Sequence, residues 1–364
     1  MAPQVPSDGR SMCFRYNTQE RGEKKAGGDP TSDFQLEGRI EQLQRHALLA
    51  PTSVCPLTFS CIVHEWALSA AEKSNDLQWS GRALQQTPPG TCPSNPYLST
   101  AVARNQAVDI PTQLSLGART LQGQAHVENG QLRFCHTSCV RVIQLKFNNE
   151  KLNYLLQALF DGGLVEDYLR KVKTFLDANP YEVFTFIFTN PDGASVQNVW
   201  KPAFDAAGIT PLAYVPPSRR MRRSDWPTLG QLIDANKRVI VFLDGGAAIS
   251  GQTVDFILPQ FEMIWEDPFS PTSSNFPCSI DRTSGPLPND DHMHLINHNL
   301  NAVIFGSVLI ADFANAQRTN SLDSILAHAN GCAPLSQGRA PNFVLLDFID
   351  VGATKQAVDR LNGF

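Results

Sequence analysis

Three short runs of almost entirely apolar residues constrain the fold of this chain more than any other feature. They are VFTFIFT at 183–189, RVIVFL at 238–243 and NFVLLDFI at 342–349. Strands that are apolar at every position are buried on both faces, which is typical of parallel sheets covered by helices. An amphipathic stretch at 164–179 has apolar residues at helical spacing. The pattern predicts βα units with parallel strands.

The length of the patterned region distinguishes two parallel folds. From about residue 95 to the end, the chain is long enough for a (β/α)8 barrel of roughly 250 residues. A doubly wound sheet is the alternative, but no G-x-G-x-x-G follows any of the runs, so nucleotide binding gains no support. We therefore predict an α/β fold with a TIM-like (β/α)8 barrel at 95–364.

Residues 1–94 lack this pattern. One amphipathic helix stands out within 32–50, and the remainder mixes Cys, Pro, Gly and isolated apolar residues. We predict that this region is poorly structured. The first thirty residues are polar, so we expect no signal peptide, and no apolar stretch approaches the ~20 residues that span a bilayer.

Charge and cysteine content narrow the function classes. The net charge of −5 gives no reason to expect nucleic acid as a partner. The eight cysteines are an even set, which predicts disulfides and an oxidising compartment, with buried free thiols as the alternative. There is no C-x-x-C, so we predict no metal site.

Polar residues follow the predicted strands directly. Active sites of parallel barrels lie at the carboxyl ends of their strands, so these residues are candidates for a site. Each alone is weak, because a strand-end aspartate also serves as a helix N-cap. The candidates are Gln122, Gln124, His126, His136, Asn190, Asp192, Asp244, Glu266, Asp267, Asn297, His298, Asp347 and Asp350.

His136 is the most specific of them, because it follows a strand inside CHTSC. Pairing of Cys135 with Cys139 would hold its imidazole on a constrained loop, which suits a general acid with a pKa near neutrality. A surface loop histidine is the alternative. His294 and His298 are four apart in DDHMHLINH, as in helical metal sites, but their apolar neighbours favour a structural role.

The only strong basic run is RRMRR at 219–223, after two prolines. It is either a solvated surface loop or a segment that meets anionic phospholipid head groups at a membrane surface.

Several segments carry a resemblance to a known family. They are NQAVDIPTQLSLGARTLQGQAHVENGQLRFCHTSC, FLDANPYEVFTFIFTN, FEMIWEDPFSPTSSNFPCSIDR and GRAPNFVLLDFIDVGATKQAVDRLNG. In order and spacing they resemble the fungal PLC-like phosphodiesterases, relatives of the phosphatidylinositol-specific phospholipase C X domain. The resemblance covers about residues 95–364.

The resemblance implies an extracellular phosphoric diester hydrolase, in lipid metabolism, that works with two histidines. The family's general acid lies in a motif that stands here as FCHTSC, so His136 takes that role. A strand-end aspartate that supports a histidine matches Asp347 best, beside Asp350. The expected substrate contacts are Gln122, Gln124, Asn190, Asp244, Glu266 and Asp350, and the expected disulfides are Cys135–Cys139 and Cys278–Cys332.

The family's other histidine, the general base, is missing. Its G-A-H-N/D-S motif should precede NQAVDIPTQ, where this chain has Cys92 and no histidine between His64 and His126. The strand that precedes this motif in the family is also unrecognisable, so we expect the first strand of the barrel to be incomplete or aberrant. An N-terminus wrongly assigned by splicing or gene prediction would explain this, and so would a degenerate enzyme. Since acid and base act together, we expect little or no phosphodiesterase activity from this chain. The alternative function is a non-catalytic barrel that binds a phosphate-bearing or glycan ligand.

Relatives offset the phosphate charge with an arginine or with calcium. Here the corresponding strand reads GARTLQGQ, with Arg119 retained and Gln122 and Gln124 further on. Calcium sites draw their charge from carboxylates, so we predict no cofactor and no calcium requirement. Arg119 is either a phosphate ligand or part of the buried structure. The expected partner is a phosphodiester or a phospholipid head group.

Overall fold

The computed structural model describes residues 61–64, 104–135, 145–147, 150–152, 161–304 and 308–364. All of them belong to one compact unit, Val54–Phe364, with a mixed α/β fold. The prediction for residues 1–94 falls outside the described residues except at Cys61–His64, which form strand β1, and it stays a prediction.

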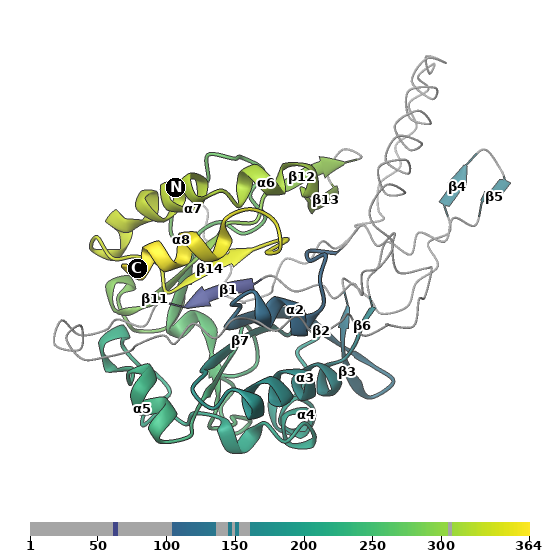
Figure 1. The fold of residues 1–364 in the computed structure, drawn as a ribbon. Helices are drawn as coiled ribbons and strands as arrows, with labels where there is room; N and C mark the ends of the chain where they lie inside the picture. The colour runs from purple at the N-terminus through teal and green to yellow at the C-terminus, as the bar shows by residue number, and fades with distance from the viewer. Residues whose placement is uncertain (1–60, 65–103, 136–144, 148–149, 153–160, 305–307) are drawn as a thin grey trace, which may run out of the picture. The chain divides into compact units, whose positions relative to one another are not determined.

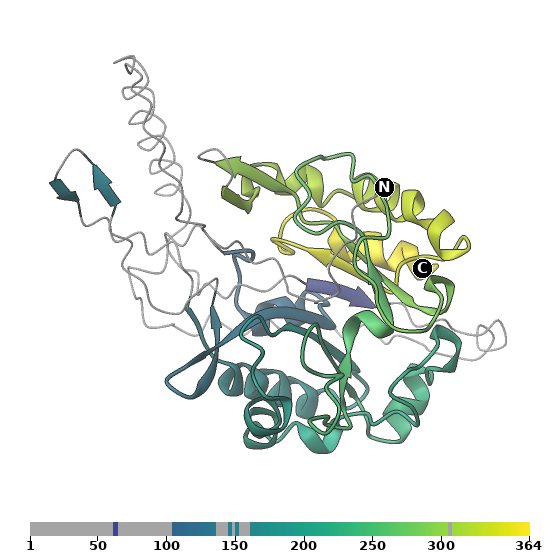
Figure 2. The same ribbon diagram turned by 180° about the vertical axis from the view of Figure 1, so that it is seen from behind.

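One large sheet organises the described part of the chain (Figures 1 and 2). Its strands follow the path β10–β11–β14–β1–β2–β7–β8–β9, while β3 pairs with β2 and β6 pairs with β3. The path strands are β1 (Cys61–His64), β2 (Thr120–Glu128), β7 (Phe184–Thr189), β8 (Val239–Leu243), β9 (Ile257–Pro259), β10 (Ile264–Glu266), β11 (Met293–Asn297) and β14 (Phe343–Leu346). The two side strands are β3 (Gln131–Cys135) and β6 (Asp161–Leu164).

The strand directions agree with the predicted parallel α/β character, with one departure. Neighbours along the path are parallel, except that β1 runs antiparallel to both β14 and β2. The two ends of the path, β9 and β10, are consecutive in the chain and are joined by residues 260–263. No ladder links these two described strands, so closure into the predicted barrel is not seen.

Apolar side chains fill both faces of the sheet, as the uninterrupted runs predict. On one face, Phe184, Phe186 and Phe188 of β7 pack in a buried cluster with residues of the helices α3 (Val165–Ala178) and α4 (Lys201–Ala206). The other face of β7 contributes to a second cluster that takes buried residues from β8, β9, β10, β11 and β14 as well. Its members include Ile187, Phe242, Leu258, Ile264, Leu295 and Phe343.

The helices lie against the outer faces of the sheet, with α3 beside β2 and β3 and with α7 and α8 beside β14 (Figure 1). Local signals fix several boundaries: Thr228 and Gln231 form a capping box at the start of α5. Helix α2 (Ile110–Ser115) begins where Asp109 caps it, with Pro111 in its first turn. The helices are α2 (Ile110–Ser115), α3 (Val165–Ala178), α4 (Lys201–Ala206), α5 (Leu229–Asp234), α6 (Ala316–Thr319), α7 (Leu322–Cys332) and α8 (Thr354–Leu361).

Shorter elements connect these units. Strands β4 (Leu145–Phe147) and β5 (Glu150–Leu152) form one hairpin, and β12 (Asn301–Ile304) and β13 (Val308–Ala311) form another. The single-turn segments are η2 (Val196–Trp200, a π-helix), η3 (Thr210–Leu212), η4 (Arg223–Asp225), η5 (Gln260–Glu262), η6 (Asn289–Asp291), η7 (Phe313–Asn315) and η8 (Ala333–Ser336). Among the described residues, no helix has the length and apolar character needed to cross a bilayer.

Candidate active site

Asn190 and Asp244 meet where two neighbouring parallel strands end. Asn190 follows β7 and Asp244 follows β8, and the Asn190 backbone N–H donates to Asp244 Oδ1 at 2.7 Å. The Asn190 side chain donates to the carbonyl oxygens of Ala194 and Gly245, at 3.0 and 3.2 Å. Burial raises the pKa of Asp244 to about 6, while the hydrogen bond from Asn190 and the charge of Arg282 oppose this rise. The sequence therefore placed both residues correctly at the carboxyl end of the sheet.

Glu266 is the fully buried centre of a second polar group, at the end of β10. Its carboxylate accepts hydrogen bonds from Gln260 and Arg282, and from Asn297 Nδ2 at 3.3 Å. Burial raises the pKa of Glu266, while the charge of Arg282 opposes the rise. The Arg282 guanidinium also stacks on Phe269, 4.4 Å from the ring centre. Sequence reasoning missed Arg282, because no strand or spacing signal marks it.

A buried chain of hydrogen bonds runs from Asp267 to the helix layer. Asp267 Oδ1 accepts from the Asn297 N–H at 2.6 Å, and Asp267 Oδ2 lies 2.8 Å from His328 Nε2. His328 Nδ1 lies 3.0 Å from His298 Nδ1, and His298 Nε2 lies 2.8 Å from the Thr319 carbonyl oxygen. A carbonyl only accepts, so His298 carries its proton on Nε2 and its Nδ1 accepts from His328. Because His328 donates from Nδ1, the hydrogen bond between its Nε2 and Asp267 Oδ2 requires one further proton, carried by either of these two atoms.

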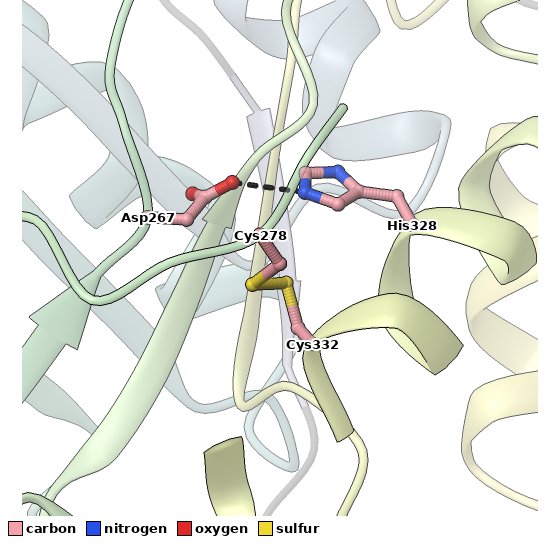
Figure 3. A group of neighbouring side chains, drawn as sticks. All are labelled: Asp267, Cys278, His328 and Cys332. Atoms are coloured by element: carbon pink, nitrogen blue, oxygen red, sulfur yellow. Dashed lines mark hydrogen bonds and ion pairs between the residues drawn. A yellow bond between two sulfur atoms is a disulfide. The ribbon is translucent and has the colours of Figure 1, made fainter. Parts of the chain in front are cut away.

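Figure 3 shows the Asp267–His328 pair beside the disulfide Cys278–Cys332. Their four possible metal-binding atoms lie within 4.8 Å of one another. Two of these atoms are sulfurs bonded to each other, and a disulfide sulfur lacks the thiolate charge that binds zinc. The predicted disulfide is present, and in this state the group is a hydrogen-bonded pair beside a covalent link.

Asp347 follows β14 and is buried. Its Oδ1 accepts from Asn105 Nδ2 at 2.9 Å, and its backbone oxygen accepts from Asn320 Nδ2 at 2.8 Å. Asp347 and His298 also line one small recess. Asp350, by contrast, is exposed. Partial burial raises the pKa of its carboxyl group, and the charge of Arg104 offsets part of this rise. The structure thus groups Asp347 with the polar strand ends and leaves Asp350 at the surface.

Gln122, Gln124 and His126 stand at every second position of β2 and are all half-buried, whereas the residue before each of them, Leu121, Gly123 and Ala125, is buried. The three polar side chains therefore share one face of the strand. His126 Nδ1 lies 2.9 Å from Asp192 Oδ1, beyond the end of β7. The sequence had predicted that all three residues follow a strand, but they lie within β2, because the strand continues to Glu128. The pairing of His126 with Asp192 was not predicted.

Two residues of the predicted site, His136 and Cys139, lie outside the described residues. The general-acid role of His136 and the Cys135–Cys139 disulfide therefore stay predictions. Cys135, the last residue of β3, is disulfide-bonded.

Arg119 and His294 have structural roles. Arg119 precedes β2, at the end of the strand away from the site, where it forms an ion pair with Glu182 through two hydrogen bonds of 2.6 and 2.7 Å. His294 lies on strand β11, so the helical spacing of a metal site does not apply to it, and the structural role favoured from the sequence agrees with its burial. Its ring stacks on Trp265 at 4.7 Å.

Two arginines of the basic run at 219–223 make contacts within the folded chain. Arg219 donates to the backbone oxygens of Val254, Ala247 and Ile257, at 2.7 to 2.8 Å. Arg220 forms an ion pair with Glu262 at 2.8 Å.

Comparison with known proteins identifies the family. The family described as PI-PLC X 1 matches residues 90–362. The chain belongs to the PI-PLC X domain family. A PI-PLC X domain-containing protein of the fungus Arthroderma benhamiae is 38% identical over 276 residues, which cover 74% of this chain and 82% of that protein. The family predicted from the sequence is therefore confirmed.

Two further relatives share a smaller part of their length with this PI-PLC X domain chain. An uncharacterized secreted protein of Arthroderma benhamiae is 35% identical over 265 residues, and a PI-PLC X domain-containing protein of Arabidopsis thaliana is 24% identical over 269 residues. In both cases the match covers 71% of this chain and 55% of the relative. The chain thus spans about half the length of these two relatives.

Proposed function

We propose that this PI-PLC X domain chain is a phosphoric diester hydrolase of the phospholipase C type. The observation that carries the proposal is that Asn190, Asp244 and Glu266 lie at the carboxyl ends of the strands β7, β8 and β10. Arg282 donates to Glu266 and is close enough for its charge to lower the pKa of Asp244. Functional sites of parallel α/β folds lie at this end. Carboxyl groups with raised pKa values are typical of catalytic clefts.

In the proposed reaction a hydroxyl, from the substrate or from water, attacks phosphorus and loses its proton to a base. The bond from phosphorus to the leaving alcohol breaks, and His136 donates a proton to the departing oxygen. Arg282 offsets charge on the phosphate oxygens, for which fixed cationic donors are suited. Its Nε atom is buried and makes no hydrogen bond within the described part of the chain. Gln122 and Gln124 supply amide donors on the same side of β2.

The proposal extends to the closure of the sheet, the location of the protein and its contact with a membrane surface. We propose that the sheet closes into a barrel, because its end strands are consecutive and its inner cluster draws on six strands. We propose an extracellular location, supported by the disulfide and by a secreted relative. The exposed Arg220 and Arg222 are the residues we propose to meet anionic head groups.

Hydrolysis of phosphatidylinositol vesicles and of a soluble aryl phosphodiester tests the proposed function. On this proposal the wild type releases the phosphorylated head group, in contrast to the little or no activity expected from the missing motif. His136→Gln should lose about 10²- to 10⁴-fold in rate, because a general acid contributes that much. His46→Gln is the matched control, since His46 precedes the family match. Equal rates for wild type and His136→Gln would contradict the assigned acid.

A non-catalytic barrel that binds a phosphate-bearing or glycan ligand is the second candidate. The observation that favours it is the missing G-A-H-N/D-S motif before residue 105. It predicts that the wild type binds a non-hydrolysable phosphonate analogue of the diester, measured by calorimetry, without turning over the diester itself.

A further inference from the structure

His126 and Asp192 form a histidine–carboxylate pair at the carboxyl end of β2 and β7. His126 Nδ1 lies 2.9 Å from Asp192 Oδ1, and the Val127 N–H donates to Asp192 Oδ2 at 2.9 Å. The carboxylate is thus held by a backbone donor and in turn orients the ring. A carboxylate that accepts from Nδ1–H leaves Nε2 as the basic atom of the neutral imidazole.

His126 lies at the same end of the sheet as the candidate site. Residues Thr120–Gln124 of β2 pair with Thr185–Thr189 of β7, and His126 follows two residues later on the face that carries Gln122 and Gln124. His64 is placed differently, because it pairs with Phe343 at the amino end of β14, whereas Asp347 follows the carboxyl end. Of these two histidines, only His126 lies at the end of the sheet where the candidate residues gather.

The Nε2 atom of His126 has no hydrogen-bond partner among the described residues, although it is shielded from solvent. The imidazole as a whole is 12% exposed. A buried polar atom without a partner destabilises the folded chain, so its presence calls for an explanation. A base awaiting a substrate hydroxyl is one, because catalytic hydrogen bonds are often incomplete before the substrate binds.

We propose that His126 is the general base of the site and that Asp192 positions it. This inference rests on the proposed phosphodiester hydrolysis. His126 Nε2 takes the proton of the attacking hydroxyl as the oxygen–phosphorus bond forms, and His136 gives a proton to the leaving oxygen as its bond to phosphorus breaks. Exchange with water then removes the proton from His126 and returns one to His136, so both histidines regain their starting state. His126 would then do the work of the histidine that is missing from the G-A-H-N/D-S motif, and the expectation of little activity would lose its basis.

The test compares the full chain with His126→Gln, His126→Gly and Asp192→Asn, and uses Glu128→Gln as a neighbouring control on β2. We expect His126→Gln to lower kcat/KM by about 10²- to 10⁴-fold and to remove the limb of the pH profile that reports the base. Asp192→Asn should lower kcat/KM by about 10- to 100-fold. Free imidazole should restore part of the activity of His126→Gly, which a merely structural histidine would not allow.

Binding of the phosphonate analogue separates the outcomes. Unchanged analogue binding by His126→Gln with lost turnover supports the inference. Turnover that His126→Gln keeps and His136→Gln loses overturns the inference and leaves the proposed function standing. A wild type that binds the analogue without any turnover overturns both.

Discussion

At the scale of single residues, Asp244 gives the clearest pH dependence. Its folded-state pKa is raised from 3.8 to about 6, so the folded chain holds the proton more tightly than the unfolded chain. Stability should therefore fall as pH rises between about 4 and 6, by at most about 3 kcal/mol. The side chain keeps some exposure to solvent, which makes this value an upper limit.

Asp244→Asn removes that titration and keeps an oxygen to accept the Asn190 N–H. We expect the variant to gain free energy of unfolding relative to the wild type on going from pH 4 to pH 7. Denaturant unfolding at the two pH values measures this gain, with the exposed Asp234→Asn as the matched control. A difference between variant and wild type that is the same at both pH values would contradict the assignment.

At the scale of elements, the Cys278–Cys332 disulfide links the segment after β10 to the last residue of α7 across 54 residues of sequence. A link that closes so long a loop stabilises mainly by restricting the unfolded chain, typically by about 2–4 kcal/mol. We expect Cys278→Ala/Cys332→Ala to lower Tm by about 5–10 °C, measured by circular dichroism. Comparing single and double variants controls for lost packing, and an unchanged Tm in the double variant would refute the stabilising role.

At the scale of the whole molecule, we expect phosphodiester hydrolysis to be independent of calcium. Calcium is bound by several carboxylate oxygens that are free to coordinate it. Here the Glu266 carboxylate is hydrogen-bonded to Arg282 and Asn297. The Asp267 carboxylate is hydrogen-bonded to His328 and Asn297, so neither group is free for calcium. Chelation with EDTA should leave both the rate and Tm unchanged. A calcium-dependent phospholipase C assayed in the same buffers serves as the control, and activation of this chain by added calcium would contradict the prediction.

Much of the fold could be predicted because buried strands and helices have characteristic patterns of apolar residues in the sequence. The apolar runs at 183–189, 238–243 and 342–349 correspond to β7, β8 and β14, and the amphipathic stretch at 164–179 corresponds to α3. The strand ends that carry Asn190, Asp244, Glu266 and Asp347 were found in the same way. Strands β9 and β11 were not recognised as strands, since a run of three to five residues carries little periodicity.

The sequence by itself determined the parallel α/β character, the family and the residues at the strand ends, because each depends on local patterns of polarity or on a contiguous motif. Only the tertiary structure decided which of those residues meet. Asn105 bonds to Asp347 across 242 residues, Asp267 to His328 across 61, and His126 to Asp192 across 66. Periodicity reports whether a side chain is buried, but partners this far apart are chosen by how the strands are ordered in the sheet. The antiparallel direction of β1, which places His64 at the amino end of β14, depends on long-range pairing for the same reason.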